Sequence, residues 1–107
     1  MERTWVVHFD SDAVADLEGV KSREDRRAVF NVVRKLKDVG PALPSPHMKS
    51  LRGEADLFEL RPKRGVCEAR LVYARLGQAF VVLAIAGRKK DFSRAVIVAN
   101  HRLSRYR

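Results

Sequence analysis

The chain has 107 residues, of which 46% are hydrophobic, and carries 22 Lys and Arg against 13 Asp and Glu, a formal net charge of +9. This balance excludes a disordered basic tail and predicts a single domain over residues 1–107. The longest apolar run, 79–86, is too short to span a bilayer, and the sequence does not begin with the apolar core of a signal peptide. The single cysteine fits a reducing compartment. We therefore expect a cytoplasmic protein with no membrane partner.

The N-terminal part predicts a strand followed by two helices. Residues 4–9 are rich in β-forming side chains, and a short helix follows in which Val14 faces inward. A second helix begins at Ser22, a capping residue, and ends at Gly40, which is followed by proline. The two helices are expected to form an N-terminal hairpin that packs on another element. The apolar residues at helical spacing in the second helix are Val29, Val32, Val33 and Leu36.

The remainder predicts a three-stranded meander and a final helix. Residues 41–56 contain three prolines and are expected to form a loop. Three strands joined by short turns follow, at 57–61, 67–75 and 79–86, and the last of them is apolar on both faces. A C-terminal helix completes the order β-α-α-β-β-β-α. The predicted fold class is therefore α+β, with an antiparallel sheet, the N-terminal hairpin and the C-terminal helix.

Several well-known site motifs are absent from the sequence. The three histidines are isolated, and the single cysteine has no partner within a few residues. There is no phosphate-binding P-loop, no dinucleotide fingerprint and no Gly-x-Ser-x-Gly nucleophile. We therefore expect neither a metal nor a cofactor. Any catalysis must come from Arg, Lys, Tyr and a few carboxylates.

The excess positive charge lies in the second half of the chain. Residues 1–54 are nearly balanced at +1, whereas residues 55–107 carry +8. A concentrated basic excess indicates a polyanion partner such as nucleic acid. The alternative is a surface charge that only keeps the protein soluble.

Four cations in this basic half form a candidate phosphate site. Arg61 and Arg70 lie on the polar sides of neighbouring predicted strands, which are about 4.8 Å apart, so both guanidinium groups can reach one patch. Lys89 and Lys90 leave the end of the next strand. On RNA, such cations can support attack of a ribose 2′-hydroxyl on the adjacent phosphorus without a metal. The alternative is a solvated face whose arginines pair with carboxylates. These carboxylates would be Glu59 and Glu68.

Residues 51–73 resemble the RelE/ParE toxin superfamily, most closely its HigB-like (phage Gp49-like) toxins. Residues 40–53 are similar to the proline-containing lead-in of that group. The Leu-Phe-Glu-Leu-Arg sequence at 57–61 resembles its strand ending in Glu-Leu-Arg, and Glu-Ala-Arg-Leu-Val-Tyr at 68–73 resembles its next strand. The lysines within 87–90 stand where these toxins carry a lysine.

The resemblance implies a RelE-like fold and cleavage of mRNA, usually in the ribosomal decoding site, without a metal. Arg61 and Arg70 match the family arginines that contact the scissile phosphate, and Lys89 or Lys90 matches the family lysine. Tyr73 also lies beside this patch in sequence, although strand alternation directs it toward the core. The residues expected to bind RNA around the site are Lys49, Arg52, Lys63, Arg64, Arg88 and Tyr73.

The resemblance also implies partners. The chain is expected to act as the toxin of a toxin–antitoxin pair, with a helix-turn-helix antitoxin, mRNA and the ribosome as partners. Operator DNA would be reached only through the antitoxin complex. Two alternatives stay open, a ParE-like inhibitor of DNA gyrase and a non-catalytic module that binds nucleic acid by charge alone.

Overall fold

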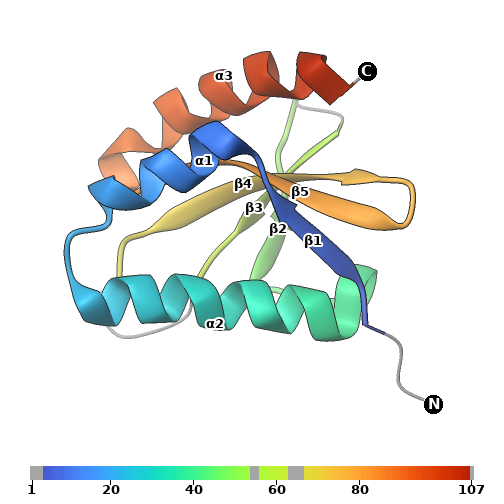
Figure 1. The fold of residues 1–107 in the computed structure, drawn as a ribbon, viewed down its shortest axis with the longest axis horizontal. Helices are drawn as coiled ribbons and strands as arrows, with labels where there is room; N and C mark the ends of the chain where they lie inside the picture. Colours follow the sequence, from blue (N-terminus) through green and yellow to red (C-terminus); the bar gives the residue numbers. More distant parts are fainter. Residues whose placement is uncertain (1–3, 54–55, 63–66, 107) are drawn as a thin grey trace.

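The computed structural model describes residues 4–53, 56–62 and 67–106, and the predicted order of helices and strands is confirmed with one strand added (Figure 1). None of the helices in these ranges is long and apolar enough to cross a membrane. Short 3₁₀ turns η1 (Leu17–Gly19), η2 (Gly40–Ala42), η3 (Lys89–Asp91) and η4 (Ser104–Tyr106) join or extend the main elements. The main elements are β1 (Val6–Phe9), α1 (Ser11–Asp16), α2 (Arg23–Val39), β2 (Met48–Ser50), β3 (Leu57–Leu60), β4 (Arg70–Leu76), β5 (Ala79–Ala86) and α3 (Phe92–Leu103).

The strands form one sheet in the order β1-β5-β4-β3-β2. Strands β2 to β5 pair antiparallel, whereas β1 lies parallel to β5 at the edge of the sheet. A parallel pair needs a long connection, which the helices and strands between β1 and β5 supply. The prediction of a loop over 41–56 is wrong for Met48–Ser50. This short polar segment has no alternating pattern, and its pairing with β3 makes it a strand.

A different helix covers each face of the sheet. Helix α2 packs on one face through the predicted residues Val29 and Leu36. Helix α3 packs on the opposite face through Ala99 and Leu103 (Figure 1). Strand β5 lies between these layers and is buried on both sides, as its continuous apolar sequence predicts.

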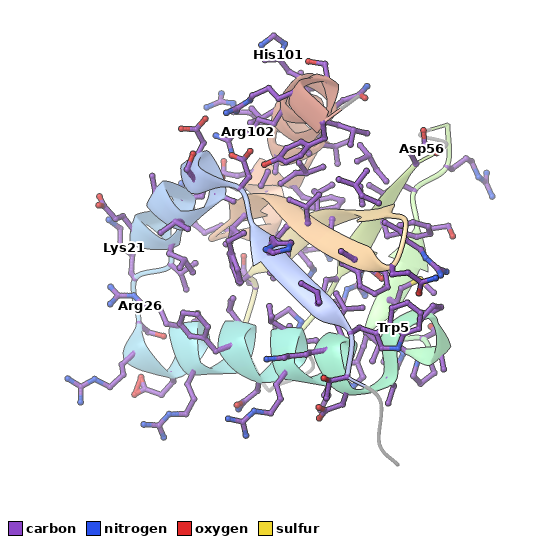
Figure 2. The ribbon with its side chains drawn as sticks, turned by 45° about the vertical axis from the view of Figure 1, so that its right-hand side comes forward. Trp5, Lys21, Arg26, Asp56, His101 and Arg102 are labelled. Atoms are coloured by element: carbon purple, nitrogen blue, oxygen red, sulfur yellow. The ribbon has the colours of Figure 1, made fainter. Side chains whose placement is uncertain are left out.

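The sequence signals at the two ends of α2 are confirmed. The Ser22 hydroxyl accepts a hydrogen bond from the Asp25 backbone N–H at 2.9 Å. At the other end Gly40 has a φ of 58°, in the left-handed region that favours glycine. A Cβ atom at Gly40 would also clash with the indole of Trp5, which lies beside this end of the helix (Figure 2). Glycine is therefore required here for both conformation and space.

The predicted N-terminal hairpin is present as α1 and α2, which run in opposite directions in Figure 1. The two helices occupy different places, because α1 borders the edge of β5 while α2 covers a face of the sheet. The prediction that Val14 faces inward is wrong, since its side chain is 51% exposed and Ala13 is buried instead. Because α1 packs against the edge of a strand and not on a face of the sheet, a different side of this short helix is buried.

An ion pair forms hydrogen bonds with the part of the β5 edge that does not pair with β1. The N–H of Ile85 donates to Asp16 Oδ2 at 3.1 Å, and the carbonyl of Leu83 accepts from Arg102 Nη1 at 2.8 Å. Arg102 Nη1 also donates to Asp16 Oδ2 at 2.8 Å. Figure 2 shows Arg102 between α3 and α1. The pair thus provides hydrogen-bond partners for two backbone groups of an interior strand.

Candidate functional site

Two arginines from neighbouring strands meet at one end of the sheet. Arg61 directly follows β3 and Arg70 begins β4. Arg70 pairs with Ala86 of β5, whose side chain lies on the face that α3 covers farther along. Glu59 lies two residues before Arg61, so it faces the same way. The structure therefore brings together the two arginines that strand alternation assigned to one patch.

The carboxylate of Glu59 joins the two guanidinium groups. Its Oε2 accepts from Arg61 Nε at 3.3 Å and Nη2 at 3.1 Å, and it lies 3.4 Å from Arg70 Nε. Only 7% of the Glu59 side chain is exposed. A carboxylate so buried needs charged partners, because moving it out of water without them costs several kcal/mol. Both arginines therefore pair with Glu59, one of the two carboxylates expected for such pairing, and they do so at a buried position instead of on a solvated face.

The two arginines differ in how far they are accessible. Arg70 is 12% exposed, and its Nη1 donates to the carbonyl of Ala69 at 2.9 Å and to that of Cys67 at 3.4 Å. Arg61 is 35% exposed, and its contact with Glu59 uses Nε and Nη2 but not Nη1. Arg70 is consequently a fixed side chain, whereas Arg61 presents N–H groups at the surface.

The backbone of Arg61 is held by His47. The Arg61 N–H donates to the His47 carbonyl at 2.7 Å, and His47 Nδ1 lies 3.2 Å from the Arg61 carbonyl oxygen. The Nζ of Lys35 lies 3.5 Å from His47 Nε2. His47 therefore contacts both backbone polar groups of Arg61. The sequence does not predict this contact, because His47 lies 14 residues from Arg61 and no sequence motif links the two.

The predicted lysines lie in η3, close to the chain that leads into β4. Both Lys89 and Lys90 are exposed. The Lys89 N–H donates to Glu68 Oε1 at 3.2 Å, which places η3 beside the start of β4. The neighbouring Arg88 is 61% exposed in its side chain and pairs with Asp91 at 3.4 Å. The turn η3, which follows β5 and carries Lys89 and Lys90, therefore lies near the start of β4, where Arg70 stands.

Lys49 extends the patch on the opposite side. It stands directly across from Glu59 in the register of β2 and β3, so its exposed side chain shares the face of Glu59. Arg52 is exposed in the turn after β2 and is not brought into the cluster by any hydrogen bond or ion pair given for the described residues. Lys63 and Arg64 lie outside the described residues.

Tyr73 is not brought to this patch. It lies on the face covered by α2 and is 3% exposed. Its ring stacks on that of Phe58 with a centroid distance of 5.4 Å and meets that of Phe80 edge-on at 5.7 Å. Burial raises the pKa of Tyr73 to about 12. Its phenol therefore stays neutral at physiological pH and packs in the core, as strand alternation indicated.

The arrangement can bind a phosphate group at the end of the sheet. Arg61 offers a planar set of N–H donors, and Lys49 with Lys89 and Lys90 can offer mobile point charges around it. Within the described ranges, no group of three His, Cys, Asp or Glu could hold a metal ion. The chemistry open to the described side chains is electrostatic stabilisation and proton transfer on a bound phosphate.

Comparison with known protein families gives one match. Residues 16–99 match the family described as phage-derived protein Gp49-like, which covers most of the chain and all of the patch described above. No curated protein matches the chain.

Solved structures give a consistent result. The chain is 26% identical to a protein in the RelBE2 toxin–antitoxin complex of Mycobacterium tuberculosis, covering 80% of this chain and 93% of that one with a TM-score of 0.61. The match to a variant of the E. coli toxin RelE in the free state has 19% identity and a TM-score of 0.60, and it covers 87% of this chain and 95% of that one. The match to the RelB–RelE complex of Methanococcus jannaschii has 15% sequence identity and a TM-score of 0.64. It covers 81% of this chain and 96% of that one. The chain therefore belongs to the Gp49-like family and has the α+β fold of the RelE toxins.

Proposed function

We propose that this chain is the toxin of a RelBE-like toxin–antitoxin pair and that it cleaves mRNA on the ribosome in the cytoplasm. Family membership and the RelE fold support the toxin role. The observation that carries the nuclease role is the cluster of Arg61 and Arg70 around Glu59, with Lys49, Lys89 and Lys90 at its borders.

The proposed reaction is an internal phosphoryl transfer. The ribose 2′-hydroxyl loses its proton to solvent as its oxygen attacks the adjacent phosphorus. The bond from phosphorus to the 5′-oxygen breaks, the leaving oxygen takes up a proton, and the products are a 2′,3′-cyclic phosphate and a 5′-hydroxyl. Arg61 offsets the charge that develops on the phosphorane oxygens, because its N–H groups are accessible. The exposed lysines Lys49, Lys89 and Lys90 add positive charge, and one of them is the candidate that donates a proton to the leaving oxygen.

The proposed partners follow from the same family. Similar solved structures include toxins bound to antitoxins, such as RelB–RelE of M. jannaschii and RelE with a RelB peptide from E. coli. We therefore expect a cognate antitoxin to bind this chain, with operator DNA contacted through that complex. The excess of +8 in residues 55–107 suits a polyanionic substrate such as RNA and ribosomal surfaces.

Induced expression followed by mapping of 5′ transcript ends tests the function directly. The expected result is a rapid stop in protein synthesis with new 5′-hydroxyl ends inside translated frames. DNA damage with intact transcripts would instead support a gyrase inhibitor. Salt-sensitive RNA binding without any new ends would support a non-catalytic module.

The site assignment is tested by the substitution Arg61→Ala. We expect cleavage to fall about 100-fold or more, as for loss of one donor to a developing anion. Thermal unfolding checks that the variant still folds, because Glu59 keeps its second partner, Arg70, in this variant. Arg34→Ala is the matched control, because Arg34 is an exposed arginine on α2, across the sheet from the patch. Full activity in Arg61→Ala would show that the assigned patch is not the site of cleavage.

A further inference from the structure

Glu59 is a buried acid inside a patch that otherwise consists of cations, and the reaction described above does not use it. We propose that Glu59 is a positioning residue that fixes the guanidinium group of Arg61 for the phosphate and anchors it to Arg70. This inference rests on the proposed function. It adds a third residue, and a division of roles between the two arginines, to that site.

The first argument is electrostatic. Arg61 and Arg70 both lie within 3.4 Å of one oxygen, Oε2 of Glu59. Two guanidinium groups so close together repel each other, and the repulsion is strong where water is largely excluded. The negative charge of Glu59 offsets it, and a carboxylate with 7% of its side chain exposed is screened little by salt.

The second argument is geometric. Glu59 Oε2 accepts from both Nε and Nη2 of Arg61, and these two contacts to one oxygen restrict the orientation of the guanidinium group. This contact leaves Nη1 directed away from the carboxylate. Arg70 is held at the same time by Glu59 and by the carbonyl of Ala69. Glu59 therefore connects an accessible arginine to an immobile one.

These contacts give the arginines different roles. Arg61 is the more accessible donor to the phosphate, whereas Arg70, which is 12% exposed, also anchors Glu59. Pre-set donors stabilise a transition state better than mobile ones, because they need no reorganisation as charge develops. Loss of Glu59 should therefore lower cleavage although Glu59 carries the same charge sign as the substrate.

A double-mutant cycle separates positioning from general stability. Single-turnover cleavage of a short mRNA on programmed ribosomes is measured for wild type, Glu59→Ala, Arg61→Ala and the double variant. We expect Glu59→Ala to slow cleavage about tenfold or more in wild type but less than about twofold when Arg61 is already absent. Glu59→Gln keeps one acceptor oxygen and should recover part of the rate. Glu24→Ala, at an exposed position in α2, should leave the rate unchanged in both backgrounds.

A measurement independent of cleavage keeps the inference testable if the nuclease role fails. The arginine Nε–Hε signals of the folded protein are recorded by NMR at pH 7. We expect the Arg61 signal to exchange with water about tenfold faster in Glu59→Gln than in wild type.

The outcomes are distinct. If wild type produces no cleavage, the proposed function is overturned, and the NMR signals decide the positioning role alone. If wild type cleaves but Glu59→Ala and Glu59→Gln cleave as fast, the positioning role is overturned and the nuclease remains. Equal effects of Glu59→Ala with and without Arg61 would make Glu59 a structural residue that does not act through that arginine.

Discussion

Exposure separates the residues that can meet a substrate from those that hold the fold. Arg61 is 35% exposed and Arg70 12%, whereas Tyr73 is 3% exposed on the opposite face. Strand alternation predicts the side on which each of these residues lies. It does not predict that Glu59 is buried, because a glutamate on the polar side of a strand is ordinarily solvated.

The position of Tyr73 gives a prediction that contrasts with that for Arg61. Tyr73→Phe should keep RNA cleavage within about twofold of wild type, because it removes only a hydroxyl from a ring on the other side of the sheet. With its pKa at about 12, Tyr73 does not exchange protons near neutral pH. Tyr73→Ala should lower the free energy of unfolding by about 3–5 kcal/mol through lost packing on Phe58 and Phe80. A tenfold slower Tyr73→Phe variant with unchanged thermal stability would place the phenol in the reaction.

At the scale of the elements, α1 and α3 are joined through the edge of β5. Strand β1 pairs with only the first half of β5, from Ala79 to Val82. Beyond that point the Asp16 and Arg102 side chains replace a neighbouring strand as hydrogen-bond partners. Both side chains are at most one-quarter exposed. Side chains from two helices thereby hold β5 in place. This strand leads directly to η3, which carries Lys89 and Lys90.

This arrangement predicts a stability defect for Arg102→Met. The substitution keeps the aliphatic stem but removes the guanidinium donor from the Leu83 carbonyl, and it leaves the Asp16 carboxylate without its charged partner. We expect the free energy of unfolding to fall by about 1–3 kcal/mol, measured by urea denaturation. Arg94→Met, at an exposed position on the same helix, should change it by less than about 0.5 kcal/mol. Equal effects of the two substitutions would show that the edge contact contributes no stability.

At the scale of the whole molecule, the sequence predicts local elements better than distant pairings. Alternation and apolar runs predict β3 to β5 because their pattern lies within each strand. The segment Met48–Ser50 has no such pattern and becomes a strand only by pairing with β3. The parallel register of β1 depends on β5, some seventy residues away. For the site, alternation predicts that Arg61 and Arg70 converge, whereas the His47 contact depends on tertiary packing.

The C-terminal turn η4 contacts the start of α1 at Asp10. The Tyr106 hydroxyl donates to Asp10 Oδ2 at 2.7 Å, and the Asp12 N–H donates to Oδ1 at 2.9 Å. Burial alone raises the pKa of Asp10, which is 2% exposed, but these hydrogen bonds and the charge of Arg105 together bring it below its usual value. The same contact with Asp10, aided by burial, raises the pKa of Tyr106.

A lowered carboxyl pKa in the folded state gives stability that is present above the unfolded pKa, about 3.9, and is lost as the pH falls through the folded value. Asp10→Asn should therefore lower the free energy of unfolding by about 1–2 kcal/mol at pH 7, with the deficit narrowing below pH 4. Urea denaturation at pH 7 and pH 3 measures both values. Asp38→Asn, at an exposed position in α2, should change the free energy of unfolding by less than about 0.5 kcal/mol at pH 7. A deficit for Asp10→Asn that is equal at both pH values would mean that the carboxylate charge does not hold η4 against the start of α1.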